Sequence, residues 1–278
     1  MIHLLVDSSS DYTMEEIKEK NIHYVPLTVM LGENSYKDGL ELTPDRFYEM
    51  LTSSKEFPKT SQPSPQDFLE VFEAAKEQGD DLICVLLSSS LSGTCQSAHL
   101  AKDMVDYDRI YIVDSLTATI MIKILVNHAY NLIKEGLPAA DIAERLNSLK
   151  GKVKVAAALD TLEYLYRGGR LSRASATIGE LANLKPIIYV TEEGEVGVLG
   201  KCIGRNKALN FILNTLETKD IDPAFPLYTV YAYGTENCEK LEEKLLQGGY
   251  SFAKREQIGS TIGAHVGPGA FGVIYVEK

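Results

Sequence analysis

Five hydroxyl side chains follow an apolar run in segment 85–94, which reads VLLSSSLSGT. From Cys95 to Val105 apolar side chains recur three or four residues apart, so a helix is predicted directly after the glycine. A strand that ends in serine and glycine ahead of a helix gathers free backbone N–H groups, the helix dipole and small hydroxyls. The segment has neither the lysine of a phosphate-binding loop nor a G-x-S-x-G elbow. It therefore predicts a site that holds an anion without acting on it.

Two further clusters have side chains that suit the same site. Segment 59–65 reads KTSQPSP, and its prolines restrict the backbone, so Thr60 and Ser61 are expected on a stiff loop ahead of a helix. Segment 259–272 contains five glycines with His265 in the middle, which indicates close approach of the backbone to another group. Taken alone, each cluster also fits helix capping or a structural histidine.

Three arginines, Arg167, Arg170 and Arg173, surround a pair of glycines. The chain as a whole has 28 basic and 39 acidic residues, a net charge of −11. Against that background the cluster predicts contact with a phosphate or an acidic partner. Compensation of a helix C-terminus and surface ion pairs are the alternatives. The overall acidity argues against broad binding of nucleic acid.

The elements that must position these residues alternate between strand and helix in the first half of the chain. Apolar runs at 2–6, 24–30, 82–87 and 110–113 predict strands, and helical patterns lie between them. This alternation is typical of βαβ units, whose ligands bind beyond the carboxyl ends of parallel strands. Polar residues at 7–10, 88–92 and 114–115 follow three strands and are expected to line one edge. Residues 116–133 predict a buried helix, too polar and too short to span a bilayer.

The second half of the chain is predicted to be mixed α+β. The sequence therefore predicts an α/β protein of two domains, with a mostly parallel sheet flanked by helices in 1–152 and a mixed sheet in 153–278. A cleft between two such domains is the expected place for a ligand. The four cysteines are scattered and the first residues lead straight into a strand, which predicts a cytoplasmic protein without a signal peptide.

Covalent hydrolysis is the enzymatic alternative. It requires Ser92 or another serine beside His265, with Asp7, Asp114 or Asp160 to orient the imidazole. The order of these residues along the chain does not exclude that geometry, so a serine hydrolase acting on acyl esters stays open. The sequence has no metal-ligand spacing and no dinucleotide-binding glycine motif after a strand.

Taken in order, the clusters resemble the DegV family. The matching segments are 6–11 (VDSSSD), 60–64 (TSQPS), 88–94 (SSSLSGT), 159–165 with 167–172 (LDTLEYL and RGGRLS) and 263–270 (GAHVGPGA). Five motifs in register over essentially the whole chain make the resemblance specific. It implies a two-domain α/β fold that buries one long-chain fatty acid between its domains, with no cofactor and no catalysis by this chain.

The resemblance further implies that the protein is the binding subunit of a bacterial fatty acid kinase. It would present the acyl carboxylate to a separate ATP-dependent kinase subunit, and the acyl phosphate would feed phospholipid synthesis. Transient membrane contact is expected for lipid loading. By motif position, the residues around the carboxylate would be Thr60, Ser92, His265, Ser61, Gly93 and Thr94, with direct hydrogen bonds from Thr60 and Ser92. The residues facing the kinase would be Arg167, Arg170 and Arg173.

The carboxylate would thus be held by neutral hydroxyls, which leave it reactive, and not by an arginine. The chain also departs from the family pattern. After Asp114-Ser115 the family usually has small residues and a glycine, whereas segment 116–123 reads LTATIMIK. These bulkier residues are expected to change the shape of the pocket, and with it the preferred chain length or unsaturation. Cys95 and Phe271, where tyrosine and leucine are common, are expected to be packing changes.

Overall fold

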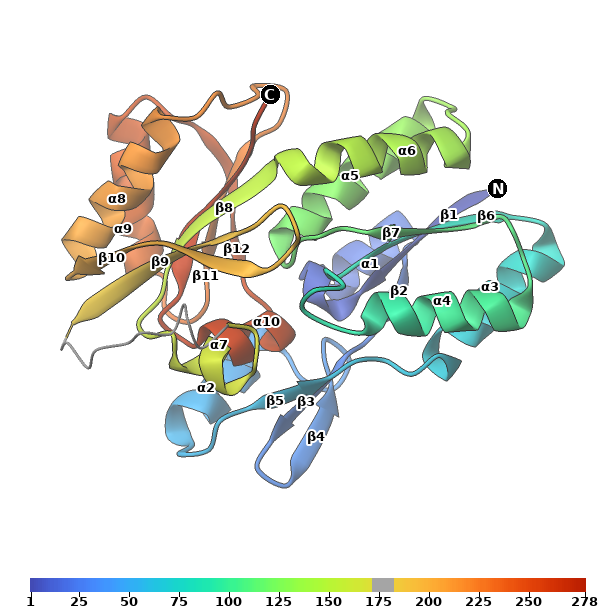
Figure 1. The fold of residues 1–278 in the computed structure, drawn as a ribbon, viewed down its shortest axis with the longest axis horizontal. Coiled ribbons are helices and arrows are strands. Elements are labelled where there is room, and N and C mark those ends of the chain that lie inside the picture. Colours follow the sequence, from blue (N-terminus) through green and yellow to red (C-terminus); the bar gives the residue numbers. More distant parts are fainter. Residues whose placement is uncertain (172–182) are drawn as a thin grey trace.

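Two β-sheets lie side by side along the long axis of the protein (Figure 1). The structure is a computed structural model that describes residues 1–171 and 183–278. The first sheet has strand order β2-β1-β6-β7, and the second has β10-β9-β8-β13-β11-β12, with all six strands from Val153 onward. The predicted α/β architecture, with a parallel sheet flanked by helices and a mixed second sheet, is confirmed.

The elements alternate along the chain as follows. The strands are β1 (Ile2–Asp7), β2 (His23–Val25), β3 (Thr28–Leu31), β4 (Asn34–Lys37), β5 (Lys59–Ser61), β6 (Asp81–Leu86), β7 (Ile110–Asp114), β8 (Val153–Ala158), β9 (Leu184–Val190), β10 (Val196–Ile203), β11 (Leu227–Tyr231), β12 (Phe252–Gln257) and β13 (Phe271–Val276). The α-helices are α1 (Met14–Lys20), α2 (Pro44–Ser53), α3 (Gln66–Gln78), α4 (Thr94–Val105), α5 (Ile120–Lys134), α6 (Ala139–Leu149), α7 (Glu163–Arg167), α8 (Arg205–Glu217), α9 (Glu236–Gln247) and α10 (Ser260–Val266). Two short 3-10 helices span Ser8–Ser10 and Lys150–Lys152.

The first sheet is parallel in all three pairings and is covered on both faces. Successive side chains of a strand point to opposite faces. On β6, Leu82 and Cys84 pack with α3 and α4, while Ile83 and Val85 pack with α5 and α6. Burial on both faces explains why these strands are continuous apolar runs and do not alternate with polar residues.

Helices α8 and α9, from the same half of the chain, cover one face of the second sheet. Ala156, Ala158 and Val273 pack against α8 and α9. The neighbouring Val155, Ala157 and Ile274 belong instead to the core shared with α5. Helix α5 packs on the first sheet, and this sheet with its helices is called the first layer below. This inward face of β8 and β13 therefore joins the two halves of the protein.

Three local expectations are corrected by the structure. The strand expected at 24–30 is divided at Pro26, which has no N–H for a sheet, so β2 enters the parallel sheet and β3 enters a separate sheet β4-β3-β5. The stiff loop expected around Thr60 is strand β5, where Thr60 pairs with Val29. The helix expected at 116–133 begins only at Ile120, because Leu116 and Thr119 have positive φ values that a right-handed helix does not accommodate. None of the helices described is long and apolar enough to cross a membrane.

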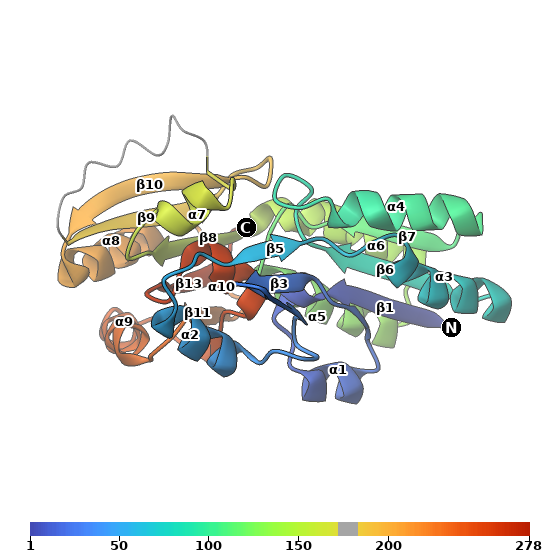
Figure 2. The ribbon, with the colours of Figure 1, turned by 90° about the horizontal axis from the view of Figure 1, so that it is seen from below.

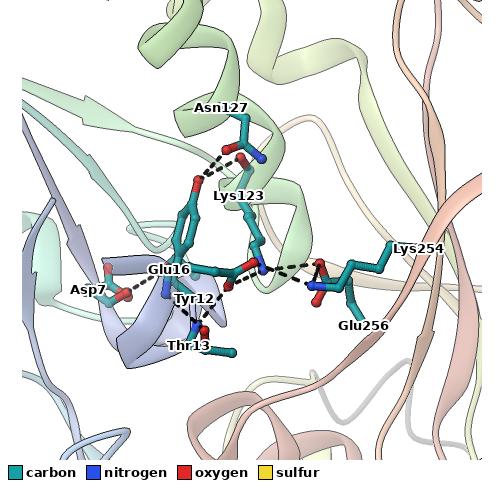
Figure 3. A network of polar contacts seen from close by, with 9 residues as sticks. Asp7, Tyr12, Thr13, Glu16, Lys123, Asn127, Lys254 and Glu256 are labelled. Carbon is teal, nitrogen blue, oxygen red and sulfur yellow. Dashed lines mark hydrogen bonds and ion pairs between the residues drawn. The ribbon is translucent and has the colours of Figure 1, made fainter. Parts of the chain in front are cut away.

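An ion network fastens α1 and α5 of the first layer to β12 of the second sheet (Figure 3). Lys123 Nζ lies 2.7 Å from Glu16 Oε2 and 3.2 Å from Glu256 Oε1, and its side chain is 4% exposed. Lys254 reaches the same two carboxylates from the surface. The Tyr12 ring lies 5.0 Å from the Lys123 ammonium. Two lysines and two glutamates thus form one ion-pair network where the two halves of the protein meet.

Lys123→Met should destabilise the protein by about 3 kcal/mol, because it removes the buried partner of Glu256 and leaves that carboxylate paired with the exposed Lys254. Lys254→Met is the matched control. Its side chain is 54% exposed, so we expect a loss below about 1 kcal/mol. Chemical denaturation of both variants measures the free energy of unfolding. Equal losses of stability would contradict the central role of Lys123 in the network.

Candidate functional site

A cavity of about 390 Å³ lies between the two sheets. Most of its wall is apolar, with Leu87 and Met121 from the first layer and Val155, Ala157 and Ile188 from the second sheet. The polar side chains that line it are Thr60, Ser61, Gln62, Ser92, Thr119, Arg170, Thr261 and His265. The expected place for a ligand, between the halves, is therefore occupied by a cavity that is mainly apolar with a limited set of polar groups.

Three separate elements position the predicted site residues. Thr60 lies on β5 and His265 on α10, and Thr60 Oγ1 is 2.8 Å from His265 Nε2. Ser92 lies in the loop before α4, where its Oγ is 2.9 Å from Thr94 Oγ1. Thr94 itself is fully buried as the first residue of α4. The structure thus brings Thr60, Ser92 and His265 to one cavity, with Thr94 behind Ser92.

His265 is a buried, neutral imidazole. Burial, and then the charge of Arg170, lower its pKa to about 4. Its Nδ1 is buried and has no hydrogen-bond partner among the described residues. A buried N–H without an acceptor is rarer and costlier than a bare acceptor. We therefore place the ring N–H on Nε2, which donates to Thr60 Oγ1 and leaves the Thr60 hydroxyl hydrogen free for an oxygen atom in the cavity.

Two glycines of the predicted motifs make room for these contacts. A Cβ on Gly168 would lie 2.3 Å from His265 Nδ1. A Cβ on Gly93 would lie 2.1 Å from Gln62 Oε1, and Gln62 donates through Nε2 to Ser97 Oγ at 3.1 Å. The lack of a side chain at Gly93 therefore leaves room for the Gln62 side chain beside the cavity. Sequence reasoning omitted Gln62 as a site residue, although it stands inside the motif TSQPS.

The arginines divide into different roles. Arg170 was expected to face a partner, but it is half-buried in the cavity wall, and its Nε donates to Leu91 O at 2.9 Å. Burial lowers its pKa. Arg170 therefore lines the same cavity as the hydroxyls that were expected to hold the carboxylate. Arg167 is exposed, pairs with Glu163 and lies over the Phe57 ring. Arg173 lies outside the described residues.

Only one of the three polar strand ends reaches the cavity. Ser8, Ser9 and Ser10 are buried and do not line the cavity: they bond to backbone and to Asp7, and the Ser8 hydroxyl lies 3.4 Å from Oγ1 of Thr261. Asp114 accepts the N–H groups of the loops beside it. The segment after β6 contributes Leu87, Leu91 and Ser92. Asp7 caps the 3-10 helix Ser8–Ser10, which was the alternative interpretation of that end, whereas Asp114 and Ser115 bond to loop backbone.

The acids required for a serine hydrolase are engaged elsewhere. Asp7, Asp114 and Asp160 were the candidates to orient His265, and their partners are Leu87 N–H, Leu116 N–H and Lys185 Nζ. Ser92 bonds to Thr94, and the hydroxyl beside the imidazole belongs to Thr60. Across the described part of the chain, these residues form no Ser-His-acid relay.

Thr119 is a cavity residue that sequence reasoning did not identify as a contact. Its φ of 57° and ψ of −143° are close to a conformation that glycine adopts readily and other residues rarely do. Its N–H donates to Ser9 O at 2.8 Å and its hydroxyl to Asp11 Oδ2. Burial raises the pKa of Asp11 to about 8. These bonds hold a strained residue in the wall, within segment 116–123, which was expected to change the shape of the pocket.

The fold and the cavity define a two-layered α/β protein with a mainly apolar cavity between its sheets. A model of the DegV family matches residues 1–278. A DegV domain-containing protein of Caldanaerobacter subterraneus is 38% identical over 281 residues, with 100% of this chain and 99% of that protein covered. This chain belongs to the DegV family.

Two solved structures of the family are similar over their whole length. One is described as fatty acid binding of a DegV family protein from Thermus thermophilus, with a TM-score of 0.89, 32% identity and coverage of 100% and 99%. The other is a stearic acid-binding protein from Eubacterium ventriosum, with a TM-score of 0.89, 27% identity and the same coverage. The family and fold implied by the motifs are confirmed.

His265 should stay neutral, with its proton on Nε2, from pH 8 down to about pH 5, because burial lowers its pKa to about 4. The unfolded chain protonates this histidine near pH 6.5, so its contribution to the unfolding free energy falls as pH drops from about 6.5 towards 4. Two-dimensional ¹⁵N spectra of the imidazole report both tautomer and titration. A midpoint near 6.5, or a proton on Nδ1, would contradict the assignment.

Proposed function

We propose that this protein binds one long-chain fatty acid, with the acyl chain in the cavity and the carboxylate near Thr60, Ser92 and His265. The observation that carries the proposal is the cavity itself, because an apolar wall with hydroxyls and an imidazole on it matches a ligand with an apolar body and a small polar head. Its volume of about 390 Å³ lies in the range of small-molecule sites. Solved relatives of the same family, described as fatty-acid binding, support it.

Burial of the acyl chain supplies the affinity. Each buried CH₂ contributes roughly 0.8 kcal/mol, so a sixteen-carbon acid gains about 11 kcal/mol before the cost of ordering it. Release is then slow, which suits a carrier that must keep its ligand out of water. The acyl chain therefore contributes most of the binding free energy, and the hydroxyls fix the orientation of the ligand.

The carboxylate needs hydrogen-bond donors from the protein. Thr60 is free to donate because His265 donates to it, and Ser92 donates from the loop ahead of α4, where backbone N–H groups also gather. The guanidinium of Arg170 adds a positive charge to the same cavity, while its Nε is held by Leu91 O. We infer that the head is bound by two hydroxyls and stabilised at longer range by Arg170.

We further propose that the protein presents this carboxylate to a separate ATP-dependent fatty acid kinase. A carboxylate oxygen would attack the γ-phosphorus of ATP, ADP would leave, and the acyl phosphate would pass to phospholipid synthesis. Arg167, exposed at the end of α7, supports docking of such a partner. In this role the protein is a cytoplasmic, non-catalytic carrier that contacts a membrane transiently for loading.

Native mass spectrometry of the purified protein, followed by solvent extraction, tests the binding function. We expect one fatty acid per wild-type chain. Thr60→Ala and Ser92→Ala should each weaken retention at least about tenfold, because each removes a hydrogen bond to a charged group. Ser64→Ala, on the exposed loop before α3, is the control and should change nothing.

Absence of lipid from the wild-type protein would contradict fatty-acid binding. Ester hydrolysis that depends on Ser92 and His265 would indicate a hydrolase instead. The kinase proposal has its own measurement, the formation of hydroxamate from acyl phosphate when kinase, ATP and loaded protein are mixed. If the loaded protein yields no acyl phosphate with any such kinase, presentation fails and binding stands.

Thr119→Gly should widen the range of acyl chains that the protein retains. The glycine suits the φ of 57° and removes a side chain from the cavity wall, so bulkier cis-unsaturated or branched chains gain space. Thr119→Ser keeps Cβ and the hydroxyl that bonds to Asp11, and serves as the control. The fatty acids that co-purify from the same cells report the change. An unchanged lipid profile in Thr119→Gly would show that this residue does not shape the pocket.

A further inference from the structure

The loop Ser88–Ser92 belongs to the first layer, yet the second half of the protein holds it. Ser88 Oγ donates to Gly194 O at 2.9 Å, and Ser90 Oγ donates to Glu193 O at 2.6 Å. Both acceptors lie in the turn between β9 and β10. In Figure 2 this hairpin and α4 lie on the same face of the protein, opposite α1. The function of these two serines is not explained by ligand contact, because neither lines the cavity.

The loop is a single hydrogen-bonded turn, so the position of Ser88 determines the position of Ser92. Ser88 O accepts the N–H groups of Leu91 at 3.0 Å and of Ser92 at 3.1 Å. Ser88 Oγ also accepts the N–H of Ser90 at 3.3 Å. A displacement of Ser88 therefore displaces the backbone that carries the Ser92 hydroxyl.

The hairpin is built to receive Ser88 closely. Its turn is closed by Thr191 N–H to Glu195 O at 2.8 Å and by Gly194 N–H to Thr191 O at 3.0 Å. Gly194 has a φ of +80°, and a Cβ there would lie 2.2 Å from Ser88 Oγ. The residues that flank the turn, Val190 and Val196, line the cavity. The same hairpin thus forms part of the apolar wall and holds the loop that carries a donor for the head.

We propose that Ser88 and Ser90 are positioning residues, which set the Ser92 hydroxyl for the carboxylate by fixing its loop to the β9–β10 hairpin. This inference rests on the proposed binding of a fatty acid. The hairpin then couples two parts of the site, the apolar wall against the acyl chain and the Ser92 donor for the carboxylate. Both are correctly placed only when the hairpin contacts the loop Ser88–Ser92. Ser88 is fully buried and Ser90 is exposed, so Ser88 is the stronger of the two contacts.

The chain offers a matched control one residue away. Ser89 lies between the two positioning serines and is exposed, and its backbone N–H donates to Asp114 Oδ1 at 3.1 Å. Replacing Ser89 removes a hydroxyl from the same loop without removing a bond to the hairpin. Ser90→Thr keeps the hydroxyl and serves as the conservative variant.

Release of a fluorescent long-chain fatty acid from loaded protein is the measurement. Loss of one hydrogen bond should speed release about tenfold in Ser88→Ala and about threefold in Ser90→Ala. Ser89→Ala and Ser90→Thr should release the ligand at the wild-type rate. Gly194→Ala, which changes the hairpin from the other side, should resemble Ser88→Ala. Wild-type release rates in Ser88→Ala, Ser90→Ala and Gly194→Ala would overturn the proposal.

A double-mutant cycle separates positioning from general weakening of the fold. If Ser88 acts through Ser92, then Ser88→Ala has little further effect on release when Ser92 is already alanine. If the two effects simply multiply, Ser88 acts independently of Ser92 and the proposal fails. Should Ser88→Ala fail to fold, Ser90→Ala in the same cycle gives the same decision. A wild-type protein that binds no fatty acid contradicts the proposed function instead, before any variant is compared.

Discussion

The interior of this protein must accommodate polar groups in a cavity whose wall is mainly apolar, and the arrangement of the site follows from that constraint. A buried donor without a partner is costly, so each polar group in the wall is bonded to another group of the protein or left with an open position that a ligand can use. The contact between His265 and Thr60 meets this requirement in one way. The neutral ring satisfies the hydroxyl oxygen and leaves the hydroxyl hydrogen available.

The same constraint explains why the two halves are joined by polar contacts at the edges of the cavity. Lys123 fastens α5 to β12 through Glu256 on one side. On the opposite face, the hairpin accepts hydrogen bonds from Ser88 and Ser90. The cavity lies between these attachments, so its volume and the position of Ser92 both depend on how the halves meet. The proposed binding therefore depends on the contacts between the two sheets.

Much of this could be predicted because it depends on local patterns. The serines after β6 stand at the carboxyl end of a parallel strand, which places Ser92 at a ligand edge. The glycines around His265 indicate close approach, and a Cβ on Gly267 would indeed lie 2.6 Å from the Tyr164 ring. Three features depend on tertiary structure and could not be derived. Arg170 turns back to Leu91 in another half of the chain, Thr119 takes a positive φ without being glycine, and Thr60 becomes strand by pairing with β3.

A crystal structure of the protein as purified, without added lipid, tests the central claim most directly. The account predicts continuous density for an acyl chain in the cavity, with one carboxylate oxygen within hydrogen-bond distance of Thr60 Oγ1 and the other near Ser92 Oγ. A cavity filled only by water, or a carboxylate bound beside Thr119 and Thr261 with the chain running towards His265, would contradict it.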